Sequence, residues 1–331
     1  MDARLTPGAS PIEVLFVLLP DSLILDWAGP AEALRIANQC MQAAGRPAAF
    51  HLRFVGPQPR ARSSVGAMVS DIEPLPTQLP DPCWVVLVGQ LGTRIAVDNQ
   101  PACQLMAWLR GLQLGAGKLE LLTVCAGAVL AGHASLLDGR RATTHHQHLD
   151  ELRSVAPACD VVGNRVFLMD GPVCSSAGVT TGIDLFLHRI SMVCGPALAA
   201  QVAQGMVVAL RRGPNDPELS PFLRFRDHLH PAIHRVQDTI GQQPQADWSL
   251  PRMAEVACTS PRHLTRLFLA HAGIGPLAYL RSIRLDLAEA ALRSGHSVTQ
   301  AAELAGFSSD TQLRRTWHLL GKAGSPNRRS G

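Results

Sequence analysis

A proline-rich segment at residues 211–223 separates two parts of the sequence that have different patterns. It reads RRGPNDPELSPFL, and its three prolines, one glycine and several turn formers make it the best linker in the chain. Before it, short apolar runs alternate with helical patterns, and after it the strand signals vanish. At 331 residues the chain has the length of about two domains, or three. We therefore expect one domain over residues 10–210, a linker over 211–229 and a second domain over 230–331.

The N-terminal part has the element order of an α/β domain. We expect strands at residues 13–19, 50–55, 84–88 and 119–124, and helices at 30–44, 101–112 and 126–137. The first helix is placed from Pro30 because proline suits a first helical turn. The third run is continuously apolar, as in strands that are buried on both faces, and the fourth is also expected to be a buried strand. This alternation predicts a flavodoxin-like domain with a mostly parallel sheet, followed by an all-α domain.

Composition excludes several classes of protein. Apolar residues make up 47% and charged residues 17%, so the chain can bury real cores and is not disordered. Its apolar runs are far shorter than the roughly 20 residues that span a bilayer, and the N-terminus has no signal-peptide layout. We therefore expect a cytoplasmic protein that does not contact membranes. The eight cysteines include no Cys-x-x-Cys pair, which predicts free and mostly buried thiols.

Positive charge is concentrated in the last third of the chain. From His230 onward there are 12 Lys and Arg against 7 Asp and Glu, whereas the first 229 residues hold 18 against 19. This asymmetry indicates an anionic partner for the C-terminal part, and nucleic acid before membrane.

A helix-start pattern occurs twice in the C-terminal part. Residues 260–268 read SPRHLTRLF, in which serine caps a helix, proline takes its first position, and Leu264 and Phe268 fall on one face. The pattern recurs 49 residues later, where four positions correspond: Ser309, Leu313, Arg315 and Trp317. A short helix and a tight turn precede each copy, and one long helix over residues 276–294 is expected between the copies. This arrangement is typical of two helix-turn-helix units.

Each second helix begins with long or polar side chains that suit base edges and phosphates. The predicted DNA-binding residues are Ser260, Arg262, His263, Arg266, Ser309, Asp310, Thr311, Gln312, Arg314 and Arg315. Periodicity alone would equally fit an arginine-dotted helical bundle. The duplication and the basic excess together favour DNA binding.

Residues 232–326 resemble the DNA-binding module of the AraC/XylS family in motif order and spacing. The connecting stretch also fits, with Gly275, Tyr279 and Arg284 at the family's positions. The resemblance implies two helix-turn-helix units on one linker helix, which enter successive major grooves. Leu313 and Trp317 stand where the family usually has Phe, and the end of the chain lacks the usual Tyr-Arg.

Cys125 follows a predicted buried strand and precedes an alanine-rich helix, within Thr-Val-Cys-Ala-Gly-Ala. A nucleophile at a sharp strand-to-helix turn with small neighbours has the geometry of an elbow. We expect the positive end of the helix to lower the pKa of this thiol. The alternative is a buried structural cysteine.

Three histidines lie close together at His145, His146 and His148. No cysteine or carboxylate pattern completes a ligand set, so we expect no metal and no cofactor. A partnership between His145 and Cys125 is the better interpretation, although the sequence gives no distance.

Residues 12–194 resemble the PfpI superfamily, whose domain is similar to class I glutamine amidotransferases. The resemblance implies that Asp26 approaches the elbow thiol, that His145 lies near it, and that backbone N–H groups of Gly89, Gln90 and Ala126 form an oxyanion-hole-like nest. Gln90 replaces the usual second glycine of its loop. Ala126 replaces the histidine of the hydrolytic branch, which weighs against a protease or amidase.

The order of the two resemblances is that of the GlxA-type branch of AraC/XylS regulators. The branch implies a DNA-binding transcription regulator, not an enzyme, with no catalytic residues expected. A small metabolite of the amine, amino acid or betaine class would bind at Cys125, Ala126, Asp26, Gly89, Gln90 and His145. Partners would be operator DNA, the effector, RNA polymerase and a second copy of the chain. The alternatives are a redox sensor that uses Cys125 and a cysteine amidase or hydrolase.

Overall fold

The structure is a computed structural model that describes residues 10–208, 212–214, 225–226, 228–293, 295–320 and 325–326. Contacts divide the chain into two compact units, Met1–Glu218 and Leu219–Gly331. Within the predicted linker, residues 211, 215–224 and 227 lie outside the described part of the chain. Ser294, the predicted last residue of the long helix, also lies outside it.

Unit 1 is built on one seven-stranded sheet with the order β10-β11-β7-β6-β1-β2-β5. Its strands are β1 (Ile12–Val17), β2 (Phe50–Gly56), β5 (Glu73–Pro74), β6 (Cys83–Leu87), β7 (Leu119–Val124), β10 (Phe167–Asp170) and β11 (Val173–Ser176). All neighbours are parallel except β10 and β11. Two small pairs join β3 (Arg60–Arg62) to β4 (Met68–Ser70) and β8 (Arg141–Ala142) to β9 (Asp160–Val161). The predicted mostly parallel sheet is confirmed.

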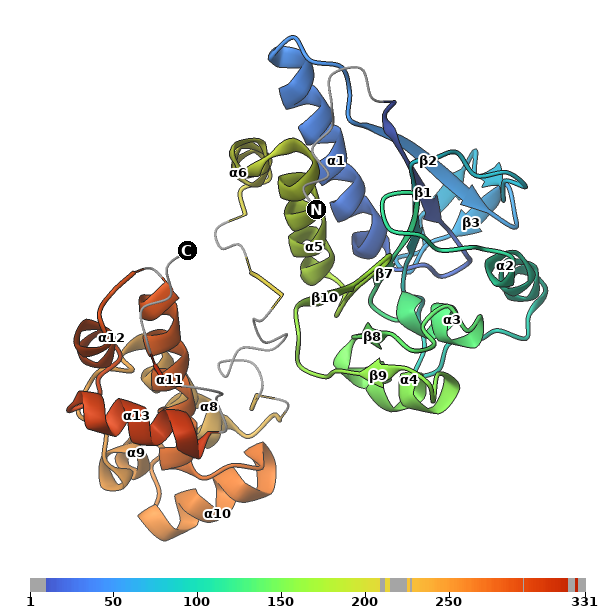
Figure 1. Cartoon of the computed structure of the whole chain (residues 1–331). Helices are drawn as coiled ribbons and strands as arrows, with labels where there is room; N and C mark the ends of the chain where they lie inside the picture. The colour runs from blue at the N-terminus through green and yellow to red at the C-terminus, as the bar shows by residue number, and fades with distance from the viewer. Residues whose placement is uncertain are drawn as a thin grey trace. The chain divides into compact units, whose positions relative to one another are not determined.

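Helices cover both faces of this sheet (Figure 1). On one side, α1 (Ile24–Ala43), α5 (Thr180–Cys194) and α6 (Pro196–Gly205) pack against one another. On the other side lie α2 (Gln100–Arg110), α3 (Gly127–His133) and α4 (Leu149–Val155), with the 3₁₀ turn η1 (His146–His148) before α4. The central strands β6 and β7 are almost wholly buried between these layers, as expected of central parallel strands.

The predicted start of the first helix is wrong. The helix α1 begins at Ile24, and Pro30 lies inside it and is buried. Proline in a helix interior removes a backbone hydrogen bond, so local preference favours a later start. Tertiary contacts instead fix the helix start at Ile24. Leu23 donates its N–H to Gly89 O at 2.8 Å, and the Asp26 carboxylate accepts backbone N–H groups from two other segments.

The prediction that most cysteines are buried is also wrong. Cys83, Cys125 and Cys174 are buried, whereas Cys103 and Cys258 are exposed and the remaining three are half-buried. All eight are free thiols, as expected.

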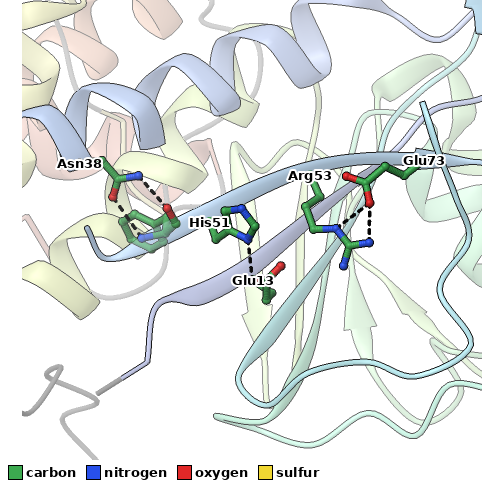
Figure 2. Close-up of polar contacts among 6 residues, drawn as sticks. Glu13, Asn38, His51, Arg53 and Glu73 are labelled. Carbon is green, nitrogen blue, oxygen red and sulfur yellow. Dashed lines mark hydrogen bonds and ion pairs between the residues drawn. The ribbon is translucent and has the colours of Figure 1, made fainter. Parts of the chain in front are cut away.

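Polar contacts tie the edge of the sheet together (Figure 2). Asn38 on α1 donates from Nδ2 to Phe50 O at 2.7 Å, which anchors the start of β2. His51 and Glu13 join β2 to β1, with 2.7 Å between Nδ1 and Oε1. Arg53 joins β2 to β5 through Glu73, with 2.6 Å between Nη2 and Oε2. These side chains add contacts to the backbone pairing of β1 with β2 and of β2 with β5.

Unit 2 is all helical in the part that is described, as predicted. Its helices are α8 (Pro231–Gln242), α9 (Leu250–Val256), α10 (Pro261–Ala272), α11 (Pro276–Arg293), α12 (Val298–Leu304) and α13 (Asp310–Leu319). Phe268 and Tyr279 belong to one core, and Leu313 and Trp317 to another. The long helix α11 contributes to both, so it joins two similar halves. No helix in the described residues of either unit is long and apolar enough to cross a membrane.

Candidate functional site

Cys125 lies at the sharp turn between β7 and α3. Its φ is +56°, in the left-handed region that non-glycine residues seldom adopt, and its side chain is 3% exposed. The Cys125 N–H donates to Ser176 O on the neighbouring strand at 3.1 Å. The backbone conformation and the position after a buried strand are those of a nucleophile elbow, as the sequence predicts.

Asp26 meets this thiol from the first turn of α1. Its carboxyl group is fully buried and is hydrogen-bonded to the side chain of Cys125. The backbone N–H of Val179 donates to Oδ1 at 2.8 Å and that of Gly89 donates to Oδ2 at 3.1 Å. Burial raises the pKa of Asp26 to about 6, and the three hydrogen bonds oppose this rise. The prediction that Asp26 approaches the elbow thiol thus agrees with the geometry.

Two glycines allow the backbone to close around Cys125. A Cβ added to Gly178, whose φ is +95°, would lie 2.3 Å from the Cβ of Cys125. A Cβ added to Gly89 would lie 2.9 Å from Asp26 Oδ2 and 3.1 Å from the sulfur. Both positions therefore exclude any larger side chain.

Residues 143–148 also contact the elbow. Thr144 donates from Oγ1 to Cys125 O at 2.8 Å, which places the residue before His145 against the elbow. Burial lowers the pKa of His145 to about 4, and His146 and His148 add to the effect. His145 is therefore neutral at physiological pH. His148 pairs with Glu151 at 2.7 Å, and Glu151 also accepts the N–H of Ile95 at 2.8 Å.

Of the three N–H groups predicted to form the oxyanion-hole-like nest, that of Gly89 has an acceptor within the protein. The N–H of Gly89 already donates to Asp26. The side chain of Gln90 donates from Nε2 to Pro20 O at 2.9 Å. Its Oε1 is buried without a partner among the described residues. Within that part of the chain, no group of three or more His, Cys, Asp and Glu side chains is arranged to hold a metal ion.

Sequence reasoning missed Gly178 and Val179. Val179 has φ +53° and ψ −116°, a strained conformation for a β-branched residue, and it directly precedes α5. The sequence Gly-Val-Thr-Thr at a helix start was the available signal. The pairing of β11 with β7, which brings this segment to the elbow, is not visible in the sequence.

The two predicted recognition helices are α10 and α13. Ser260 caps α10 by accepting the N–H of His263 at 3.3 Å, and Ser309 caps α13 by accepting the N–H of Gln312 at 3.2 Å. Outward-facing residues include several of the predicted DNA-binding set: Arg262, Arg266, Thr311, Gln312, Arg314 and Arg315. The local capping signals thus placed both helices correctly.

Some of the predicted DNA-binding side chains already have intramolecular partners. Asp310 accepts a hydrogen bond from Thr299 Oγ1 at 3.0 Å, and Gln312 Oε1 accepts the Ser308 N–H at 2.8 Å. Arg314 donates to Ser325 Oγ at 2.8 Å. Arg266 and His263 lie side by side on α10, with 2.8 Å between Nη2 and Nδ1.

Comparison with known proteins agrees with both units. The helix-turn-helix domain family matches residues 253–320. The chain is 30% identical over 306 residues to the HTH-type transcriptional regulator CdhR of Pseudomonas aeruginosa, covering 91% of this chain and 87% of that one. It is 28% identical over 324 residues to the HTH-type transcriptional regulator GlxA of Rhizobium meliloti, covering 96% and 95%.

A solved structure also shares the fold. A ThiJ/PfpI family protein from Pseudomonas syringae matches with a TM-score of 0.52 and 18% identity, over 76% of this chain and 92% of that one. The sequence relatives are named as transcription regulators, which agrees with the expectation of a non-enzyme. The chain therefore shares the fold of a ThiJ/PfpI family protein in addition to its helix-turn-helix domain, and it belongs to the GlxA-like regulators of the AraC family of HTH-type transcriptional regulators.

Proposed function

We propose that this regulator senses a small metabolite at the elbow site and responds by changing how its helical domain binds DNA. In this proposal residues 10–210 form the sensor, 211–229 the linker and 230–331 the DNA-binding domain. The observation that carries it is the buried carboxyl of Asp26, which holds the Cys125 thiol and the N–H groups of Gly89 and Val179. Four segments of the sensor therefore depend on one titratable group.

The electrostatics of this site favour a cationic ligand. Burial makes the ionised form of Asp26 costly, as its raised pKa of about 6 reflects. A neighbouring ammonium or quaternary nitrogen would stabilise the carboxylate, and the neutral His145 would not repel it. This reasoning supports the amine, amino acid or betaine class that the family resemblance implies. Gly89, Gln90, Cys125, Ala126 and His145 would complete the site.

On the DNA side, we propose that α10 and α13 enter successive major grooves. Each helix presents outward-facing arginines at its solvent face, and α11 holds both helices through the two cores that it shares. A homodimer would match repeated half-sites, and RNA polymerase is the expected further partner in the cytoplasm.

Oxidation of Cys125 is a second candidate signal, favoured by its contact with Asp26. In this reaction the Cys125 thiol gives its proton to the Asp26 carboxylate, and the thiolate attacks one oxygen of hydrogen peroxide. The O–O bond breaks, Cys125 becomes a sulfenic acid, and the departing hydroxide takes the proton from Asp26 and leaves as water. A thiol reductant would reverse it. This alternative predicts that DNA affinity changes with peroxide and not with metabolites.

A thermal-shift screen of the full-length protein tests the proposal. The panel holds amino acids, polyamines, betaines and small amides, and each is also tested on Cys125→Ala and Asp26→Asn. A ligand at 100 times its dissociation constant adds about 2.7 kcal/mol of stability, which is readily seen. We expect a hit that both variants lose and that the matched variant Cys103→Ala, an exposed cysteine on α2, retains. A hit that survives in both elbow variants would contradict the site assignment.

A further inference from the structure

Arg212 is fastened to the first turns of α5. Its backbone N–H donates to Asp184 Oδ1 at 3.0 Å and its Nε donates to Oδ2 at 2.8 Å. Its Nη2 donates to Thr180 Oγ1 at 2.8 Å. The side chain of Asp184 is 4% exposed, so its two bonds to Arg212 are partly shielded from water, whereas the bond to Thr180 is exposed. Thr180 and Asp184 are four residues apart on one helix face, and together they hold the guanidinium and backbone of Arg212.

The same end of α5 also forms part of the elbow site. Val179, the residue before the helix, donates its N–H to Asp26. Thr181 donates from Oγ1 to the carbonyl of Gly178 at 2.8 Å, and Gly178 lies directly against Cys125. The start of α5 is therefore in contact with the elbow thiol and its carboxyl on one side and with Arg212 on the other.

The strained backbone at Val179 makes this junction sensitive to the elbow. A β-branched residue at φ +53° is held there only by its surroundings, and its N–H group donates to Asp26. When that bond is lost, the turn that leads into Thr180 is free to relax toward an ordinary conformation. Such a relaxation would move Thr180 and Asp184, which are the two acceptors of Arg212.

We propose that the first turns of α5 couple the elbow site to the linker. The Asp184–Arg212 pair is the positioning contact in this coupling. Through it, a change at Asp26 or Cys125 reaches residues beyond 212. This inference rests on the proposed function and specifies its regulation. Arg212 is anchored in the resting state. A ligand that competes for the Asp26 carboxyl favours the state in which Val179 has relaxed and Arg212 is released. Coupling requires that the ligand bind the two states differently.

Hydrogen exchange of the full-length protein tests the coupling without any ligand. Two variants disturb the elbow, Asp26→Asn and Cys125→Ser, and one disturbs the anchor, Asp184→Asn. Asp150→Asn is the matched control, because Asp150 pairs with Arg153 on the exposed face of α4. The readout is the exchange rate of peptides that contain Val179 and Arg212, with peptides from β1 and β6 reporting on the integrity of the core.

We expect Asp26→Asn to speed exchange at Val179 and also at Arg212 by about fivefold, the effect of losing one typical hydrogen bond. Asp184→Asn should speed exchange at Arg212 and, because coupling is reciprocal, at Val179. Asp150→Asn should change neither. If the elbow variants free Val179 while exchange at Arg212 stays at the wild-type rate, the coupling does not exist.

This outcome can be separated from the fate of the proposed function. A metabolite hit in the thermal screen together with unchanged exchange at Arg212 rejects the coupling alone. Coupled exchange with no hit across the metabolite panel keeps the α5 connection and rejects the proposed effector class. Cys125→Ser preserves the size of the side chain, so it keeps the test available if Asp26→Asn unfolds unit 1.

Discussion

The backbone N–H of Val179 donates to the carboxylate of Asp26 at 2.8 Å, across 153 residues of sequence. This bond joins the first turn of α1 to the entry of α5, and Cys125 lies against Asp26 and against Gly178, the residue before Val179. The elbow site is therefore assembled by long-range contacts. Gly89, Cys125 and Val179 follow the ends of β6, β7 and β11, which lie at one edge of the sheet. Ligands in open α/β sheets bind at this carboxyl edge.

The buried carboxyl of Asp26 should make the stability of unit 1 depend on pH. Its pKa rises from an ordinary value of 3.8 to about 6 in the folded protein. The native state then holds a proton that the unfolded state releases between these two pH values, so stability falls as pH rises from about 4 to about 6. The shift corresponds to about 3 kcal/mol. Asp26→Asn should remove this decline.

Urea unfolding at pH 4 and pH 7 measures this effect as the difference between wild type and variant. Other carboxyl groups titrate over the same range, and subtraction of the two curves cancels their contribution. Asp150→Asn, on the exposed face of α4, should show the wild-type pH profile. Parallel profiles for wild type and Asp26→Asn would show that burial does not perturb this carboxyl.

Gly178→Ala should destabilise unit 1 by about 3 kcal/mol, since it adds a clash to an unfavourable φ. The new methyl group would lie 2.3 Å from Cys125 Cβ and 2.8 Å from its sulfur. Gly45→Ala separates the two causes, because Gly45 also has positive φ, +69°, but nothing within 4 Å of an added Cβ. The control should lose only about 1 kcal/mol. Equal losses in thermal unfolding would mean that the elbow does not restrict this position.

Local signals predicted much of the architecture. The continuous apolar run of β6, the mostly apolar run of β7 and the serine caps Ser260 and Ser309 act over a few residues. The sequence alone therefore shows them. The start of α1 predicted from Pro30 is wrong because the turn before Pro30 contacts Gly89 and Val179. These contacts begin the helix earlier than the local preference of proline indicates.

The rest of the candidate site depends on pairings between distant segments. Asp26 and His145 were placed near Cys125 through a family resemblance, whereas nothing local marks Val179 as the donor to Asp26. The anchoring of Arg212 on Asp184 is equally invisible, because an Asp and an Arg 28 residues apart form no recognisable pattern. Such contacts follow from which strands become neighbours, and no short segment determines that.

The buried ion pair between Glu120 and Arg189 should be costly to break. Both side chains are 9% exposed, and the guanidinium of Arg189 lies 4.7 Å from the centre of the Trp84 ring. Glu120→Gln leaves a buried cation without its anion and should cost about 3 kcal/mol in urea unfolding. Glu32→Gln, in an exposed pair with Arg35, should change stability by about 0.5 kcal/mol or less. A similar cost for both variants would argue against the buried character of the first pair.

The placement of the recognition helices predicts a defined salt dependence. Arg266→Ala on α10 and Arg315→Ala on α13 each remove an exposed cation, and neither arginine pairs with an acidic side chain in the described part of the chain. If each arginine meets a phosphate, affinity for mixed-sequence duplex DNA should fall, and the slope of log affinity against log salt should be shallower by about 1. Arg35→Ala in unit 1 is the control and should leave the slope unchanged. The same loss on any DNA sequence indicates phosphate contact, whereas a loss confined to one sequence indicates base readout. Wild-type affinity and slope in both recognition-helix variants would reject α10 and α13 as the DNA-binding elements.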